Sequence, residues 1–314
     1  MNQKIIATQI GNIIWKIVRF VILLGLSYIL VYPVLYMVSM AVRPASQVMD
    51  PSITWIPKSF TVEQFATALE TMDYFGAMTT TTVMGLVSTV LQLISCSMVG
   101  YGFARFKFKS SGLWFTLVML TLIVPASAIT IPMYFQYREF SIPIIGPILT
   151  NVFGIKMPDF LTVNMIDSWF VFWLPALLAT GLRSGLYVYI FRQFYRNIPV
   201  EIEEAALVDG AGYFKTFYRI MVPNASGSFL TVFLFSIVWY WNDTFYSSNF
   251  ITRKRTLAKA LSNLRGDLGG GNDYYSLSPK VMAGALLFVT PMLLIYIVLQ
   301  RYFVQSVERT GIVG

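Results

Sequence analysis

Six long apolar segments divide the sequence and limit what the chain can fold into. They cover residues 17–40, 77–104, 113–136, 169–191, 227–249 and 281–304. A helix needs about 20 mostly apolar residues to cross a bilayer, because no backbone group can remain unpaired in hydrocarbon. With 56% hydrophobic and 12% charged residues, the chain is far more apolar than soluble globular proteins. The sequence therefore predicts an all-α integral membrane protein with six transmembrane helices.

The residue inventory argues against chemistry on a bound substrate. The chain has no histidine, and its one cysteine, Cys96, lies in an apolar segment. Histidine-based triads, thiolate metal clusters and disulfides are therefore without their partners. The sequence also lacks the GxxxxGK[ST] loop that cradles nucleotide phosphates. We expect no catalytic residue, no metal site and no cofactor on this chain, and hence no enzyme.

The positive charge of the chain is distributed in a way that suits membrane topology. The net charge is +8, but the basic residues stand between apolar runs and form no single basic face, which argues against nucleic acid. Six spans place both termini on one side of the membrane. The basic turn at 105–109 between the second and third spans assigns that side to the cytoplasm. A basic N-terminus without a cleavage site predicts a retained anchor helix.

The spans predict one membrane domain with a peripheral first helix. Residues 1–76 are expected to form the anchor helix and an external loop, and residues 77–314 a five-helix core. The stretch 141–164 is interrupted by proline, glycine and charge, so we expect an interfacial helix or hairpin there instead of a seventh span. Pro125 and Pro132 in the third span each remove a helix hydrogen bond and permit a kink.

A polar, amphipathic segment at residues 195–226, between the fourth and fifth spans, differs from the rest of the chain. Strong helix formers cover Val200 to Val208, and a second helical pattern runs from Tyr213 to Pro223. Gly210 and Gly212 interrupt the two. The segment therefore predicts two short cytoplasmic helices joined at a glycine hinge.

The spacing of residues in this segment resembles the EAA signature of ABC importer permeases. That signature reads Glu-Ala-Ala, three residues, Gly, nine residues, Ile, one residue, Leu-Pro. The chain matches it at Glu204, Ala205, Ala206, Gly210, Ile220 and Pro223, with Val222 in place of Leu. The segments at 100–109, 191–199, 241–243 and 300–304 are similar to the carbohydrate, maltose-type branch of that family.

The resemblance implies an ABC type I importer permease architecture with a cytoplasmic coupling helix. It implies that the ATPase is engaged by Glu204, Ala205, Ala206, Asp209, Gly210, Ile220 and Pro223. The implied partners are a second permease subunit in a heterodimer, two ATP-binding subunits that carry ATP and Mg, an extracytoplasmic solute-binding protein and membrane lipid. The implied place is the bacterial cytoplasmic membrane, and the implied cargo is a sugar or oligosaccharide.

Ionisable and aromatic residues of the fourth and fifth spans are candidates for the substrate path. Arg183 is predicted mid-span, where a charge is costly unless it faces a cavity, a partner or water, or snorkels to the interface. Asp243, near the end of the fifth span, has the same two interpretations. Rings stack on sugars and amides bond their hydroxyls, which adds Tyr187, Trp239 and Asn242. An aromatic belt at the membrane interface predicts much of the same pattern.

Three alternatives remain open on the sequence. An importer for another solute shares the same coupling loop. A secondary transporter driven by an ion gradient usually carries paired intramembrane acids, whereas the acidic residues here lie mostly in loops. A membrane-embedded enzyme is weakened by the missing histidine and by the lack of a nucleophile beside a base.

Overall fold

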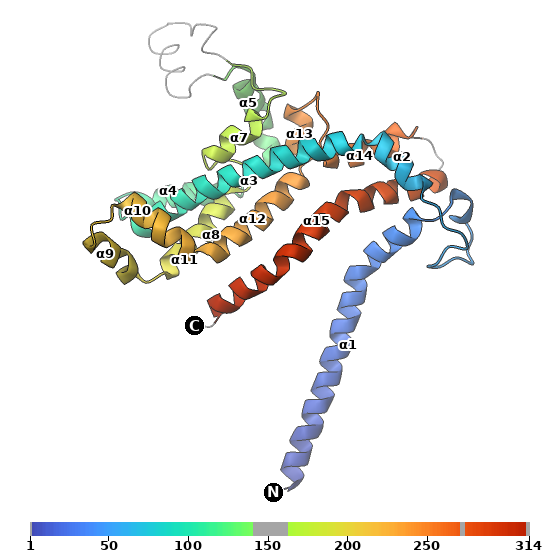
Figure 1. Ribbon diagram of the computed structural model, residues 1–314, viewed down its shortest axis with the longest axis horizontal. Coiled ribbons are helices and arrows are strands. Elements are labelled where there is room, and N and C mark those ends of the chain that lie inside the picture. The colour runs from blue at the N-terminus through green and yellow to red at the C-terminus, as the bar shows by residue number, and fades with distance from the viewer. Residues whose placement is uncertain (1, 141–162, 271–273, 312–314) are drawn as a thin grey trace. The chain divides into compact units, whose positions relative to one another are not determined.

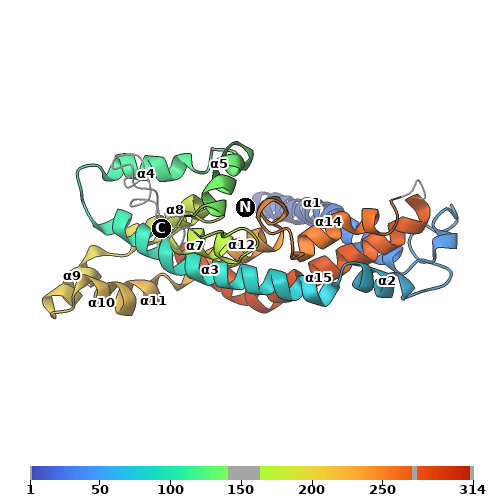
Figure 2. The same ribbon diagram turned by 90° about the horizontal axis from the view of Figure 1, so that it is seen from above.

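The computed structural model describes residues 2–140, 163–270 and 274–311, and the regular elements in these ranges are helices (Figures 1 and 2). An isolated antiparallel bridge joins Phe140 to Val163. The predicted interfacial helix or hairpin at 141–164 lies, apart from its last two residues, outside the described residues. The all-α prediction is confirmed.

The chain forms two compact units. Unit 1 comprises Met1–Met72 and Asn263–Val289, and unit 2 comprises Asp73–Ser262 and Thr290–Gly314. Two helices, α14 (Leu257–Asp267) and α15 (Tyr274–Gly311), begin in one unit and end in the other. The predicted assignment of residues 1–76 to an anchor and an external loop stays a prediction.

Unit 1 is dominated by helix α1 (Asn2–Ala41), followed by η1 (Ala45–Gln47) and α2 (Glu63–Thr71). Apolar side chains from residue 13 to residue 38 are exposed along α1, up to 76% at Leu30, which suits surrounding hydrocarbon. The loop after α1 folds back on its end. There the Ser39 hydroxyl donates to the carbonyl of Trp55, and the Tyr32 and Trp55 rings meet edge to face at 5.0 Å.

Helix α3 (Tyr74–Arg105) is the centre of unit 2 and packs against α7 (Phe170–Leu177), α8 (Ser184–Asn197) and α12 (Ser226–Trp241). Most residues of its buried face are small, and small residues permit close approach of membrane helices. At Gly100 an added Cβ would lie 2.6 Å from Cβ of Phe191 and 3.0 Å from the backbone nitrogen of Arg192. Glycine at this position therefore sets the α3–α8 spacing.

The predicted third and fourth spans are not continuous helices. The third is divided into α4 (Ser111–Leu120) and α5 (Ala126–Arg138), and the fourth into α7 and α8. Pro125 precedes α5 and has no N–H to donate to a helix ladder. Between α7 and α8, Ala179 (φ 56°) and Arg183 (φ 58°) adopt left-handed backbone. Arg183 thus lies in the break between two helices and not within a continuous one.

The remaining helices complete unit 2. They are α9 (Val200–Val208), α10 (Tyr213–Thr216), the π-helix η3 (Phe217–Met221), α11 (Val222–Asn224) and α13 (Phe245–Phe250). Among the described residues, the helices long and apolar enough to span a membrane alone are Gly11–Ala41, Tyr74–Arg105 and Tyr275–Tyr302. The pair Tyr213–Asn224 and Ser226–Trp241, bent by 77°, adds a fourth if it is one span. The predicted count of six spans is therefore not confirmed.

Two apolar clusters make the core of unit 2. One contains Tyr101, Phe191, Tyr195, Phe217 and Met221, and it joins the end of α3 to α8 and to η3. The other contains Met84, Phe172, Tyr240, Phe250 and Ile251.

A turn after α13 is tied to the loop before α7 by one carboxylate. Asp167 accepts hydrogen bonds from the backbone nitrogens of Thr252 (2.5 Å) and Arg253 (3.0 Å). Burial alone raises the pKa of Asp167, but the hydrogen bonds from Arg253 and Thr252 outweigh it, so that the pKa lies below its ordinary value. The Lys254 ammonium lies 4.2 Å from the ring centre of Trp169.

Candidate functional site

The polar segment between α8 and α12 folds as two short helices around a glycine turn. The predicted first helix, Val200–Val208, is confirmed as α9, and the second helical stretch begins at Tyr213 and continues through η3 and α11. Gly210 has a φ of +79°, a backbone conformation that other residues adopt only with strain. Its N–H donates to the Leu207 carbonyl at 3.1 Å. Figure 1 shows α9 and α10 together at one end of unit 2, beyond the C-terminal end of α3.

One face of this helical loop is open. Glu204, Ala205, Asp209 and Gly210 are exposed. Large apolar side chains stand out beside them: Val208 is 87%, Phe214 72% and Tyr218 66% exposed. Exposed apolar groups rimmed by charge are typical of a protein-binding surface.

The opposite face of α9 is fastened to α3. Glu203 and Ala206, three residues apart, are both buried. The Nε atom of Arg105 lies 2.9 Å from Oε2 of Glu203, and each side chain is only 8% exposed. The Tyr101 hydroxyl donates to Oε1 of the same carboxylate. Both oxygens of Glu203 are therefore engaged by the last two turns of α3.

The end of α3 also contacts the segments on either side of α9. Arg105 Nη2 donates to the carbonyl of Ile198, at the end of α8, at 2.7 Å. The Tyr101 ring lies 5.6 Å from the ring of Tyr195 and 5.0 Å from that of Phe217. Two residues of α3 thus contact the chain before, within and after α9.

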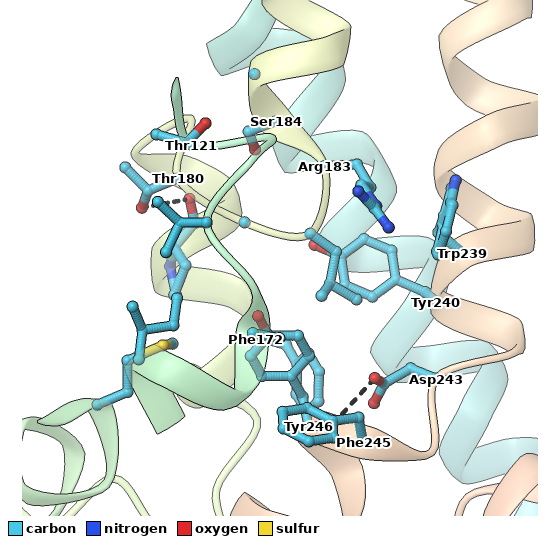
Figure 3. A pocket seen from close by; sticks show the side chains of 18 of the residues that line it. Thr121, Phe172, Thr180, Arg183, Ser184, Trp239, Tyr240, Asp243, Phe245 and Tyr246 are labelled. Carbon is cyan, nitrogen blue, oxygen red and sulfur yellow. Dashed lines mark hydrogen bonds between the residues drawn. The ribbon is translucent and has the colours of Figure 1, made fainter. Parts of the chain in front are cut away.

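A cavity of about 680 Å³ opens in unit 2 where the helices are broken. Its walls come from the α4–α5 break, the α7–α8 break and the C-terminal end of α12. Arg183, Trp239, Asn242 and Asp243 line it, and Figure 3 shows Arg183 and Trp239 facing each other across one side. The Arg183 guanidinium lies 4.4 Å from the centre of the Trp239 ring.

The two charged residues of the cavity have different surroundings. Both carboxylate oxygens of Asp243 accept backbone hydrogen bonds at the start of α13, from Tyr246 (3.1 Å) and Ser247 (2.8 Å). Asp243 therefore caps α13. Within the described part of the chain, Arg183 has no carboxylate within ion-pair distance, and its exposed side chain keeps donors available to the cavity.

A family comparison decides what kind of protein contains these features. The model of the family described as "Binding-protein-dependent transport system inner membrane component" matches residues 96–309. The chain belongs to this family. It is a membrane-embedded component of an ABC transport complex with other subunits, and it is a transport component, not an enzyme.

The sequences of two relatives align with nearly the whole length of this transport component. The arabinooligosaccharides transport system permease protein AraQ of Bacillus subtilis (strain 168) is 24% identical over 96% of this chain and 97% of the relative. The lactose transport system permease protein LacG of Rhizobium radiobacter is 26% identical over 92% of this chain and 94% of the relative.

A solved structure of a bacterial ABC transporter involved in the import of the acidic polysaccharide alginate contains a chain with the same fold. The TM-score is 0.71 at 18% sequence identity, over 93% of this chain and 98% of that chain. This likeness establishes the fold of an importer permease, as the sequence predicted.

The structure separates the predicted site residues of the permease into two places. Glu204, Ala205, Asp209 and Gly210 lie on the open loop face, whereas Ala206 is buried. Ile220 is partly buried in η3 and Pro223 lies in α11.

Of the predicted substrate-path residues, four line the cavity: Arg183, Trp239, Asn242 and Asp243. Tyr187 is fully buried in the core cluster that contains Tyr101 and Phe191, and it does not line the cavity.

Sequence reasoning missed the pairing of Glu203 with Arg105 and the exposed apolar groups beside α9. The signal for Glu203 was its three-residue spacing from Ala206, which places both on one helical face. Arg105 lies within the 100–109 segment already noted for its resemblance to carbohydrate permeases.

Proposed function

We propose that this chain is one of two membrane-spanning subunits of an ATP-driven importer in the bacterial cytoplasmic membrane. Its cargo is a sugar or oligosaccharide handed over by an extracytoplasmic binding protein. Family membership supports the importer, and the names of relatives that carry arabinooligosaccharides and lactose support the cargo class. The second membrane subunit, the two ATP-binding subunits and the ATP and Mg that they bind are further parts of the proposal.

The observation that carries the proposal is the open face of α9 and α10. Glu204 and Gly210 are exposed there at the spacing of the EAA signature, beside the exposed Asp209, Val208 and Phe214. A short helix pair that offers charge and apolar groups suits a cleft on a partner protein. ATP binding in that partner moves the loop, and only a difference in affinity between two conformations can shift the transporter between them.

The cavity is proposed as a stretch of the sugar path. The exposed Trp239 ring offers a face for sugar stacking, and Arg183 lies beside it (Figure 3). Asn242, which also lines the cavity, supplies an amide. Asp243 contributes by holding α13 in place at the cavity wall, because its oxygens are already bonded.

Affinity purification of the tagged chain from its native membrane in mild detergent tests the proposal. We expect an ATP-binding subunit and a second multi-span subunit to co-purify. Glu204→Lys and Gly210→Pro should lose sugar uptake while membrane insertion is unchanged, because the first reverses a charge on the open face and the second cannot adopt a φ of +79°. Glu70→Lys, a charge reversal at an exposed position of α2, is the control and should retain uptake. Normal uptake by both loop variants contradicts the assignment.

A further inference from the structure

Helix α3 connects the loop to the cavity through buried polar contacts at two levels. At its end, Arg105 and Tyr101 hold the Glu203 carboxylate of α9. In its middle, Gln92 is fully buried and donates from Nε2 to the Leu182 carbonyl and to Oγ of Ser184, each at 2.8 Å. Leu182 and Ser184 flank Arg183 in the break that lines the cavity.

The Gln92 amide also reaches the helix on the other side of α3. Its Oε1 accepts a hydrogen bond from Oγ of Ser236, on α12, at 2.8 Å. Helix α12 ends near Trp239 and Asn242, which also line the cavity. Gln92 thus joins α3 to two separate walls of the cavity.

From these contacts we propose that α3 transmits displacement of α9 to the cavity walls. The buried Arg105–Glu203 pair attaches α9 to α3. The inference rests on the proposed coupling function of the loop. Arg105, Glu203 and Tyr101 are positioning residues in this scheme, because they touch neither the sugar nor the ATP.

The geometry suits a rigid connection. Arg105 is thirteen positions after Gln92 in one uninterrupted helix, which is about 20 Å at 1.5 Å per residue. Arg105 engages one oxygen of Glu203 and Tyr101 the other, so α9 cannot slide along α3 without breaking both contacts. Arg105 also binds the Ile198 carbonyl at the end of α8. A solvated salt bridge would give no such constraint, since exposed pairs are weak.

The two adjacent glutamates have different roles: Glu203 attaches α9 to α3, and Glu204 contributes to binding of the ATPase. Glu203 faces α3, whereas Glu204 is exposed on the open face. Loss of Glu203 should therefore leave the ATPase bound and disconnect its motion from the cavity. Loss of Glu204 should weaken the docking itself.

The test uses the complete transporter, with its partner subunits and binding protein, in proteoliposomes. Three quantities are measured for each variant: ATPase subunit retained, ATP hydrolysis rate, and labelled sugar transported per ATP. We expect Glu203→Gln to retain the ATPase subunit and hydrolysis but to lower sugar transported per ATP by about tenfold, within the range of coupling between linked sites. Glu70→Gln, at an exposed glutamate of α2 outside the loop, is the control and should transport normally.

A covalent link between positions 105 and 203 tests whether attachment of α9 to α3 is what transport requires. In a Cys96→Ala background, Arg105→Cys with Glu203→Cys removes the ion pair and should transport poorly. Bis-methanethiosulfonate reagents of increasing spacer length then join the two positions. We expect one length to restore sugar transported per ATP, and a reducing agent to abolish it again.

Tyr101→Phe gives an independent measurement if the Gln variant folds poorly, because it removes one hydrogen bond and keeps the rings and the ion pair. It should lower transport per ATP by a smaller factor in the same direction. If Glu203→Gln leaves sugar transported per ATP unchanged, or if no crosslink restores it in the double-cysteine variant, transmission through α3 is rejected. Absence of an ATP-binding subunit from the wild-type complex overturns the proposed function itself.

Discussion

Neighbouring glutamates on α9 occupy contrasting surroundings. The Glu203 carboxylate is buried against Arg105 and Tyr101, and the Glu204 carboxylate is exposed. A buried ion pair gains little over an apolar pair, but removal of one partner leaves an unpaired charge and costs about 3–5 kcal/mol. An exposed side chain without such a partner contributes within about 0.5 kcal/mol.

Alanine at these two positions should therefore have unequal effects on stability. Glu203→Ala is expected to lower the thermal unfolding temperature of the detergent-solubilised chain substantially, because Arg105 is left buried without its carboxylate. Glu204→Ala, the matched control on the next residue, should leave it nearly unchanged. Equal melting temperatures for the two variants, followed by tryptophan fluorescence, contradict the buried pair.

Glycines on α3 allow a similar matched comparison. A Cβ on Gly100 would lie 2.6 Å from Cβ of Phe191, whereas a Cβ on Gly102 meets only the Phe106 ring, at 4.0 Å. Gly100→Ala should destabilise by about 1–3 kcal/mol through overpacking. Gly102→Ala should be neutral or stabilising by up to about 1 kcal/mol, because alanine favours a helix more than glycine does. Thermal unfolding of both variants in one detergent measures the difference.

At this scale the sequence predicted part of the site. The EAA spacing located Glu204 and Gly210, and the φ of +79° agrees with the predicted glycine hinge. The EAA spacing did not locate Glu203, because a linear motif records the spacing of residues and not the direction of their side chains. Residues adjacent in a helix point about 100° apart, so one carboxylate is buried and the next is exposed.

Broken helices are where element-level prediction failed. Residues 113–136 and 169–191 are apolar enough to predict continuous spans, and hydropathy averages over a window without detecting a break inside it. Pro125 was recognised as a kink, but it precedes a new helix. The left-handed backbone at Ala179 and Arg183 could not be predicted from composition, because residues other than glycine rarely adopt it. These breaks also create the cavity.

The Asp167 carboxylate helps to hold the turn after α13. Hydrogen bonds to Thr252 and Arg253 hold its pKa below the ordinary value, so the stability they contribute is present above the unfolded-state pKa of about 3.9 and is lost as the pH falls through the lower folded-state pKa. Asp167→Ala is expected to lose about 1 kcal/mol near neutral pH. The difference in melting temperature from wild type should shrink below about pH 4.

Asp167→Asn is the control for that prediction. Asparagine keeps an acceptor oxygen and tolerates the left-handed backbone at this position, where φ is 64°. It should melt above Asp167→Ala near neutral pH, with a smaller dependence on acid than wild type. Trypsin should cut after Arg253, whose side chain is 86% exposed, faster in Asp167→Ala than in Asp167→Asn. Identical cleavage rates in the two variants would contradict a role for the acceptor oxygen of residue 167 in holding this turn.

Orientation of the whole molecule follows from the proposed function and the charge pattern together. If the loop at α9 and α10 meets an ATPase, it is cytoplasmic, and so is the basic turn after α3 that contains Lys109. The chain then crosses the membrane before the turn that contains Arg253, which is predicted to be external. If the chain has the six spans that the sequence predicts, the N- and C-termini are cytoplasmic as well.

Cysteine labelling measures that orientation directly. In a Cys96→Ala background, Arg253→Cys should react with a membrane-impermeant maleimide in cells or spheroplasts whose cytoplasmic membrane is intact. Lys109→Cys should react only after that membrane is permeabilised. Both side chains are exposed in the structure, so a difference in labelling reports sidedness and not burial. Labelling of Lys109→Cys before permeabilisation would place the loop on the outside, where no ATP-binding subunit could reach α9, and coupling through that loop would be rejected together with the orientation.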